Sequence, residues 1–220
     1  MIIHGAGSFG HIVAAQYDIV DGFKENRQLE GLIAIRNDMN ELSTKVTFSL
    51  LKAGLKAVSF QTSSLVYGDD EASEKLVFVE PLLEALKLGI TPVLSGDVIF
   101  SAKKSFTILS GDRLIEYLVQ EIDVNRVVFI SDVDGLYIKK PETNEPVLVT
   151  SLYIDDLTDI QLANLNSNVA TDVTGNMLGK YNSIRAILQF VDEVIIVNGN
   201  YPKRIFNALS RIPDKYTIIK

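Results

Sequence analysis

The sequence predicts an α/β protein with a mainly parallel central sheet, and three observations support that prediction. Apolar runs rich in β-branched residues end in Gly or Asp and alternate with longer segments of helical period, as in β-α-β connections. Hydrophobic residues make up 47% and charged residues 22% of the chain, which is the balance of a globular protein rather than a disordered one. A length of 220 residues suits one domain, or two closely packed lobes of one sheet.

The expected strands share β-branched apolar residues and lie at 1–4, 57–61, 91–94, 106–109, 126–131 and 193–198. The longest helix is expected at 31–52, where apolar residues recur at three- and four-residue steps and Gly54 follows as a C-cap. Shorter helices are expected at 75–88, 112–121 and 180–190. A hairpin is expected at 95–105, and the proline-containing stretch from Lys139 to Val147 is expected to be a loop.

The acidic charge balance and the absence of cysteine exclude several classes of function. Lys and Arg number 21 against 28 Asp and Glu, a net charge of −7, which argues against a nucleic acid or an anionic membrane as the main partner. Without Cys there are no disulfides, thiolate metal sites or cysteine nucleophiles. No apolar run reaches the roughly 18 residues of a membrane span, and the first residues lack the pattern of a secretion signal. We therefore expect a cytoplasmic protein. Separately, no cluster of metal ligands can be read from the sequence.

The run Gly5-Ala6-Gly7-Ser8-Phe9-Gly10 matches G-x-G-x-x-G between an expected strand and a helix-like stretch. Closely spaced glycines let backbone N–H groups approach an anion, and a helix N-terminus adds partial positive charge. The anion is either part of a dinucleotide or a substrate phosphate. A dinucleotide site needs an acidic residue at the end of a second strand, and its candidate, Asp38, falls inside the expected helix 31–52. His11 suits a phosphate site, where an imidazole donates a hydrogen bond; a tight turn without a ligand is the remaining alternative.

Five further segments accompany this run, and each is rich in Gly, Asp or Asn. They are Ser95-Gly96-Asp97-Val98, Ser110-Gly111-Asp112, Ser131-Asp132-Val133-Asp134-Gly135-Leu136-Tyr137, Asp172-Val173-Thr174-Gly175-Asn176-Met177-Leu178-Gly179-Lys180 and Asn198-Gly199-Asn200. Together they resemble the amino acid kinase superfamily over essentially the whole chain. The run from His4 to His11, with Asn198-Gly199-Asn200, is similar to the archaeal-type isopentenyl phosphate kinases. The resemblance implies one domain over 1–220, a three-layer αβα sandwich, with an acceptor-binding half at about 1–110 and a nucleotide-binding half at about 111–220.

The resemblance also implies an activity. Members of this branch transfer the γ-phosphoryl group of ATP to isopentenyl phosphate and form isopentenyl diphosphate, in isoprenoid biosynthesis through the mevalonate pathway. Two anions must meet in line, so the protein's task is positioning and charge neutralisation more than covalent chemistry. ATP and Mg²⁺ are the implied cofactors, and a homodimer is the implied assembly.

Residue roles follow from the same resemblance. The residues implied for the acceptor phosphate are Ala6, His11 and Gly111, and those implied for ATP are Gly7, Asp132, Tyr137, Lys139, Pro141, Asn176 and Lys180. Lys180 also stabilises the transferring group, and Asp112 orients lysine ammonium groups. The isoprenoid tail is expected along Leu32, Ile35, Met39 or Phe48. Without the resemblance, Asp132 and Asp134 read as a polar turn, and Arg185, Lys203 and Arg204 as surface charges.

Two departures from the family pattern bear on these expectations. Family members begin with a further strand and a glycine-rich loop with lysines, about 45 residues ahead of the first motif here, and we expect this segment to be missing. Ala6 and Asn176 replace family glycines, and Ala6 is tolerated only with a negative φ. The alternatives kept open are a fosfomycin- or uridylate-type kinase, a catalytically silent nucleotide-binding module, and the NAD-dependent oxidoreductase that Asp38 would serve.

Overall fold

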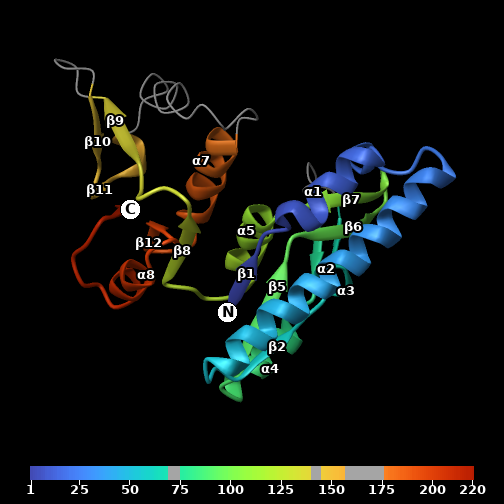
Figure 1. The fold of residues 1–220 in the computed structure, drawn as a ribbon, viewed down its shortest axis with the longest axis horizontal. Coiled ribbons are helices and arrows are strands. Elements are labelled where there is room, and N and C mark those ends of the chain that lie inside the picture. Colours follow the sequence, from blue (N-terminus) through green and yellow to red (C-terminus); the bar gives the residue numbers. More distant parts are fainter. Residues whose placement is uncertain (69–74, 140–144, 157–175) are drawn as a thin grey trace. The chain divides into compact units, whose positions relative to one another are not determined.

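The structure is a computed structural model that describes residues 1–68, 75–139, 145–156 and 176–220. It divides into two compact units, Met1–Ile122 and Asp123–Lys220. Both units mix helices with sheets that contain parallel strands, so the predicted α/β class is confirmed (Figure 1). The division of one domain into an acceptor-binding and a nucleotide-binding half near residue 110 stays a prediction. None of the helices in the described residues is long and apolar enough to cross a membrane.

The first unit contains a parallel sheet of order β1-β5-β2, and its strands are β1 (Ile2–His4), β5 (Thr91–Ser95) and β2 (Ala57–Ser59). A second sheet of order β4-β3-β6-β7 contains β4 (Lys75–Val77), β3 (Val66–Gly68), β6 (Asp97–Ser101) and β7 (Ser105–Leu109). The strands β6 and β7 pair antiparallel, which confirms the predicted hairpin. The helices are α1 (Gly7–Gln16), α2 (Asn26–Lys52), α3 (Thr62–Leu65), α4 (Glu80–Lys87) and α5 (Gly111–Glu121), with the short η1 (Ile19–Asp21).

The long helix α2 ends as predicted and begins earlier than predicted. Its end is a Schellman motif, since the Leu55 N–H donates to Leu50 O and the Gly54 N–H to Leu51 O, both at 3.0 Å, and Gly54 has φ +87°. Its start lies five residues before 31, where Gln28 Oε1 accepts from the Glu25 N–H at 3.0 Å. The first turn is mostly polar, so the apolar period does not reveal it.

Two expected elements are wrong in part. The helix expected at 75–88 begins only at Glu80, because Pro81 lacks an N–H and fits the first turn of a helix but not its interior. The residues before it form β4, which pairs antiparallel with β3. The loop expected from Lys139 to Val147 instead overlaps two paired strands, β9 (Tyr137–Lys139) and β10 (Pro146–Leu148), with Pro146 opposite Lys139. Proline is tolerated at the first residue of a strand, so it does not prevent this pairing.

The second unit contains a mixed sheet of order β11-β13-β12-β8. Its strands are β11 (Ser151–Leu152), β13 (Tyr216–Ile219), β12 (Glu193–Asn198) and β8 (Arg126–Ser131). A separate two-stranded sheet is formed by β9 (Tyr137–Lys139) and β10 (Pro146–Leu148). The helices are η2 (Ile154–Asp156), α7 (Asn176–Ile187) and α8 (Pro202–Leu209). The predicted strands 126–131 and 193–198 pair in parallel, Arg126 beside Glu193 through Ser131 beside Asn198.

The contact between α1 and α2 depends on a glycine. Gly10 is buried, and a Cβ placed there would lie 2.7 Å from Ala6 Cβ and 3.5 Å from Met39 Sδ. Contacts between real Cβ atoms are longer than 2.7 Å, so the space that Gly10 leaves is already taken by the methyl group of Ala6. The two residues therefore form a packing pair in which only one can carry a side chain.

This pairing predicts strong coupling between Ala6 and Gly10 in a double-mutant cycle. Gly10→Ala should destabilise the protein by about 1–3 kcal/mol through overpacking. In the Ala6→Gly background the same change should cost nothing or stabilise by up to about 1 kcal/mol, because alanine is the better helix former. Urea unfolding of the four proteins measures the coupling, and a value below about 0.5 kcal/mol would contradict the packing described.

Candidate active site

The predicted phosphate loop lies between β1 and α1. Gly7 has φ +51°, a left-handed conformation that glycine adopts without strain. Ala6 is the N-cap of α1 with φ −80°, so the alanine that replaces a family glycine sits in an ordinary conformation. An alanine side chain has no acceptor, and α1 has no side-chain cap. The first N–H groups of α1 therefore have no acceptor within the helix, apart from the Phe9 N–H, which donates to Ala6 O at 3.2 Å.

Two other glycine segments meet this loop at the end of β1. The Gly96 N–H donates to His4 O at 3.2 Å, in the turn between β5 and β6. A Cβ on Gly111 would lie 3.6 Å from the same oxygen, and a Cβ on Gly96 would lie 3.1 Å from the Gly111 nitrogen. Residues 5–7, Gly96 and Gly111 thus lie together although they are far apart in sequence. Gly111 begins α5, whose N-cap Ser110 accepts from the Arg113 N–H at 3.1 Å.

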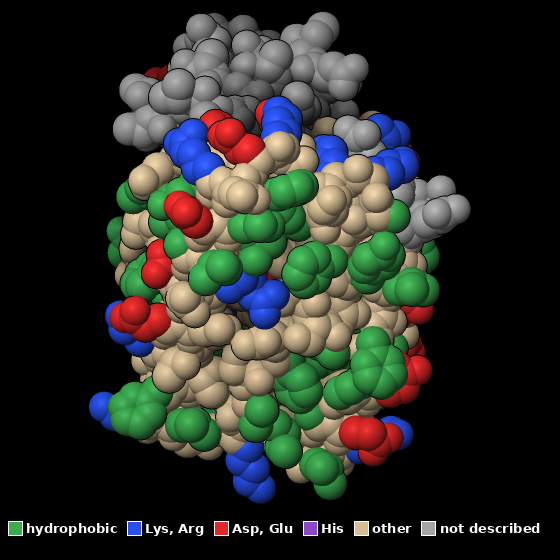
Figure 2. All heavy atoms as spheres, turned by 90° about the vertical axis from the view of Figure 1, so that its right-hand side faces the viewer, with side chains coloured by type: hydrophobic (Ala, Val, Ile, Leu, Met, Phe, Trp, Pro, Cys, Tyr) green, Lys and Arg blue, Asp and Glu red, His purple; other side chains and the backbone are tan. Residues whose placement is uncertain are grey.

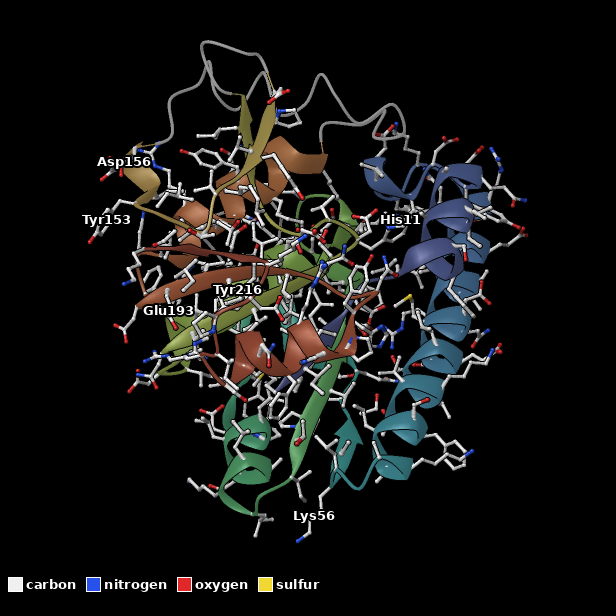
Figure 3. All side chains as sticks on the ribbon, turned by 60° about the vertical axis from the view of Figure 1, so that its left-hand side comes forward. His11, Lys56, Tyr153, Asp156, Glu193 and Tyr216 are labelled. Carbon is white, nitrogen blue, oxygen red and sulfur yellow. The ribbon has the colours of Figure 1, made fainter. Side chains whose placement is uncertain are left out.

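The remaining predicted residues of this unit lie on α1 and α5. His11 is exposed and follows Gly7 by four residues, so the two share a face of α1 (Figure 3). Asp112 is half-buried in the first turn of α5. A carboxylate there is stabilised by the helix dipole. The structure therefore brings Ala6, Gly7 and Gly111 to one edge of the β1-β5-β2 sheet.

The second unit joins two motifs that sequence analysis singled out separately. Asn198 Nδ2 donates to Asp132 O at 3.2 Å and to Asp134 Oδ1 at 2.8 Å, and Asn198 Oδ1 accepts from the Asn200 N–H at 3.0 Å. Gly135 permits this loop: it has φ +153°, and a Cβ there would lie 2.3 Å from Thr217 Oγ1. The two motifs thus form one polar cluster at the ends of the parallel strands β8 and β12.

Arg204 completes this cluster, which corrects its interpretation as a surface charge. Its guanidinium donates to Asp134 Oδ1 at 2.5 Å, stacks 3.9 Å above the Tyr201 ring, and is only 16% exposed. Sequence analysis missed this role because an arginine on an amphipathic helix gives no sign of its partner. Burial, and then the charge and hydrogen bond of Asp134, raise the pKa of Tyr137. The Tyr137 hydroxyl is therefore neutral, a hydrogen-bond donor, at physiological pH.

The other residues predicted to bind ATP are placed only in part. Lys180 is half-buried on α7, with Nζ 4.5 Å from the centre of the Phe129 ring of β8. Asp132 is exposed at the end of β8, and Ser131 Oγ donates to its Oδ1 at 3.2 Å. Asn176 begins α7 and Lys139 ends β9, whereas Pro141 lies outside the described residues.

The dinucleotide alternative loses its ribose-binding residue. Asp38 lies in the middle of α2, between Asn26 and Lys52, and not at the end of a strand. The candidate acidic partner of the G-x-G-x-x-G run therefore does not stand where a dinucleotide-binding fold requires one.

The family model described as the amino acid kinase family matches residues 1–198. Isopentenyl phosphate kinase of Methanothermobacter thermautotrophicus is 31% identical to this chain, over 95% of the chain and 79% of the relative. The protein of the same name from Methanocaldococcus jannaschii is 33% identical, over 95% of this chain and 76% of the relative.

Solved structures agree with the sequence relatives. One, described as an X-ray structure of isopentenyl phosphate kinase, has a TM-score of 0.77 at 28% identity and covers 100% of this chain and 83% of its own. A product complex of the Thermoplasma acidophilum enzyme has a TM-score of 0.75 at 26% identity and covers 99% and 82%. On its sequence, its fold and its converging glycine segments, the chain belongs to the amino acid kinase family, a family of phosphotransferases.

Proposed function

We propose that this protein transfers the γ-phosphoryl group of ATP to isopentenyl phosphate and forms isopentenyl diphosphate. The observation that carries the proposal is the uncapped N-terminus of α1 beside Gly96 and Gly111, with His11 one turn further on. Such an arrangement suits a phosphate and not a neutral acceptor. The relatives named isopentenyl phosphate kinase align with 95% of the chain and support the same acceptor.

The reaction needs fixed donors around the acceptor phosphate. The N–H groups of Ala6 and Gly7 would cradle the acceptor phosphate and the ATP phosphate that meets it. Gly111 would allow close approach of the α5 backbone to the acceptor, and His11 would add a side-chain donor to it. Asp112 has no proton to remove from an ionised phosphate, so it serves to orient cationic groups. Preorganised donors of this kind reduce the repulsion between the acceptor and the γ-phosphoryl group as they meet.

ATP would bind in the second unit. Asp132 directly follows β8, Tyr137 and Lys139 are the first and last residues of β9, and Pro141 follows in sequence. Asn176 and Lys180 lie one turn apart on α7, and the Lys180 ammonium would balance the charge of the β- and γ-phosphates. The Asp134–Arg204–Asn198 cluster supports this region by fixing the loop after β8.

We propose that Mg²⁺ enters this site bound largely to the nucleotide. The described residues hold no group of three His, Asp or Glu side chains that could bind a metal by themselves. Mg²⁺ commonly keeps several waters and takes one or two carboxylates plus phosphate oxygens, and the exposed Asp132 is the candidate carboxylate. When bound, the ion would neutralise part of the phosphate charge.

The four residues expected along the isoprenoid tail have different environments. Ile35 and Met39 are each 3% exposed in the core that α2 forms with α1 and β6. Leu32 lines an apolar cavity of about 400 Å³, whereas Phe48 is exposed under the Lys52 ammonium. Met39 Sδ lies 3.5 Å from where a Cβ on Gly10 would be, which places it against the Gly5–Gly10 run, and it is the member we propose for the tail site.

A steady-state assay with isopentenyl phosphate and Mg-ATP tests the function, and His11→Ala tests the site. The variant should raise KM for isopentenyl phosphate by about 10-fold or more and change KM for ATP by less than about 2-fold, because a hydrogen bond to a charged group is lost only on the acceptor side. Fosfomycin and uridine monophosphate serve as control acceptors. Absence of the diphosphate product, or a preference for either control, would refute the proposal; ATP binding without turnover would favour the silent module.

We further propose that the protein is a homodimer formed through an apolar surface of the first unit. The register aligns Leu76, Tyr67 and Phe100 across β4, β3 and β6, and they are 71%, 45% and 53% exposed. Phe100 also lines the apolar cavity with Phe23, Leu29 and Ile33. Hydrophobic side chains, in green, are spread over the face that Figure 2 shows. Multiplying typical residue areas by the exposed fractions gives about 600 Å² of exposed surface for these six side chains together. This area is near the roughly 800 Å² that each partner buries in a standard interface.

Light scattering after gel filtration tests the dimer. Phe100→Glu should convert it to monomer, because a charge at the centre of an apolar interface is buried without a partner. The matched control is Leu88→Glu, an exposed apolar residue just after α4 that should leave the dimer intact. A monomeric wild type, or a dimer that Phe100→Glu does not affect, would contradict the assignment of this surface.

A further inference from the structure

The imidazole of His4 joins the phosphate loop to α2 through two hydrogen bonds. Its Nδ1 lies 3.0 Å from Gly5 O, and its Nε2 lies 3.0 Å from Ser43 Oγ. A carbonyl oxygen only accepts, so Nδ1 carries the hydrogen of this contact. In the neutral ring Nε2 then accepts from the Ser43 hydroxyl, and in the charged ring it donates to the same oxygen. The bond to Gly5 therefore exists in both protonation states.

The peptide between Gly5 and Ala6 needs such a partner to keep one orientation. A Cβ on Gly5 would have no heavy atom within 4 Å, so packing does not restrain the residue, and glycine itself restrains its dihedral angles least. In a trans peptide the carbonyl and the N–H point in opposite directions. Rotation of this peptide would exchange the two groups, and the bond from His4 to Gly5 O selects one arrangement.

The selected arrangement matters for an anion. With the carbonyl of Gly5 held toward the His4 ring, the N–H of Ala6 points away from that ring. In the flipped peptide a carbonyl oxygen would replace this N–H, and it would repel a phosphate where the donor attracts one.

Ser43 gives the ring a rigid support. Ser43 lies on α2 and is only 9% exposed. The backbone of His4 is fixed by its pairing with Ser95 and by the hydrogen bond that its carbonyl accepts from the Gly96 N–H. The imidazole is thus held at its backbone by the sheet and at its far end by a helix.

We propose that His4 is a positioning residue that holds the Gly5–Ala6 peptide so that the Ala6 N–H faces the acceptor phosphate. This inference rests on the proposed function and adds a residue that touches neither substrate. It assigns to the first histidine of the run a task different from that of His11, which would contact the phosphate directly.

Three substitutions at His4 separate the two hydrogen bonds. His4→Asn places an amide N–H near the position of Nδ1 and keeps the donor to Gly5 O, whereas His4→Gln places its amide near Nε2 and loses that donor. His4→Phe keeps the ring shape and loses both bonds. The His4→Gln and His4→Phe variants should raise KM for isopentenyl phosphate by about 3- to 10-fold and leave KM for ATP unchanged. This is the factor by which the loss of one hydrogen bond lowers the population of the binding-competent peptide orientation. Asn should restore KM to within about 2-fold of wild type.

Ser43→Ala should raise the same KM by a smaller factor, because the ring loses its support but keeps its donor. The matched control is Thr44→Ala, which removes the neighbouring hydroxyl, bonded to Asn40 O at 2.8 Å and remote from His4. Equal KM values for the Gln and Asn variants would overturn the inference.

Crystal structures of the Gln and Asn variants without substrate give a second readout that does not depend on activity. The Gly5 carbonyl should turn in the Gln variant and stay in place in the Asn variant. An unchanged carbonyl in the Gln variant would overturn the positioning role. A wild type that forms no diphosphate would instead refute the proposed function while this geometric result still stands.

Discussion

The pairing of β1 with β5 is the constraint on which the proposed phosphate site depends. It places His4 opposite Ser95, so that both strands end at the same edge and the chain turns from each into a glycine segment. The His4 carbonyl then receives the Gly96 N–H, and Gly111 packs against the same carbonyl. A side chain on Gly96 would press against the α5 backbone, so the absence of side chains there permits the convergence. The sheet pairing thus positions donors that come from distant parts of the sequence.

Backbone pairing holds the loop at the strand ends in place in the first unit, whereas side chains do so in the second unit. Its strands β8 and β12 also end side by side, but the loop after β8 is held by the Asn198 amide and by the Arg204–Asp134 ion pair. Both members of that pair are largely buried, at 16% and 20% exposure, so removal of either one would leave the other charge poorly solvated. A loop fixed in this way would keep its shape during nucleotide exchange if ATP binds there as proposed.

Sequence patterns predicted the elements that short-range features of the sequence determine. They failed where an element or a side-chain partner depends on contacts between distant parts of the chain. The strands at 126–131 and 193–198, the hairpin after Ser95 and the Gly54 cap were predicted correctly, because β-branched runs and turn glycines are local features. The short strands β3, β4 and β13 were missed, since three or four residues carry too little periodicity. The run from Gly5 to Gly10 was singled out from its spacing, whereas the role of Gly111 was expected only from the family resemblance. The partners of Arg204 and of His4 were not predicted, because nothing in a sequence states which distant side chain will face them.

The two helices that begin at the phosphate site differ in a way that links binding to stability. The start of α5 is satisfied by the protein itself, since Ser110 accepts from the Arg113 N–H. The start of α1 has Ala6 as its N-cap and no side-chain acceptor, and a missing cap costs about 1 kcal/mol of helix stability. A serine or aspartate at that position would restore this stability, but its side-chain oxygen would occupy the N–H groups that an acceptor phosphate needs. Under the proposed function, the acceptor phosphate would itself cap α1, so its binding would stabilise the helix start that the free protein leaves without a cap.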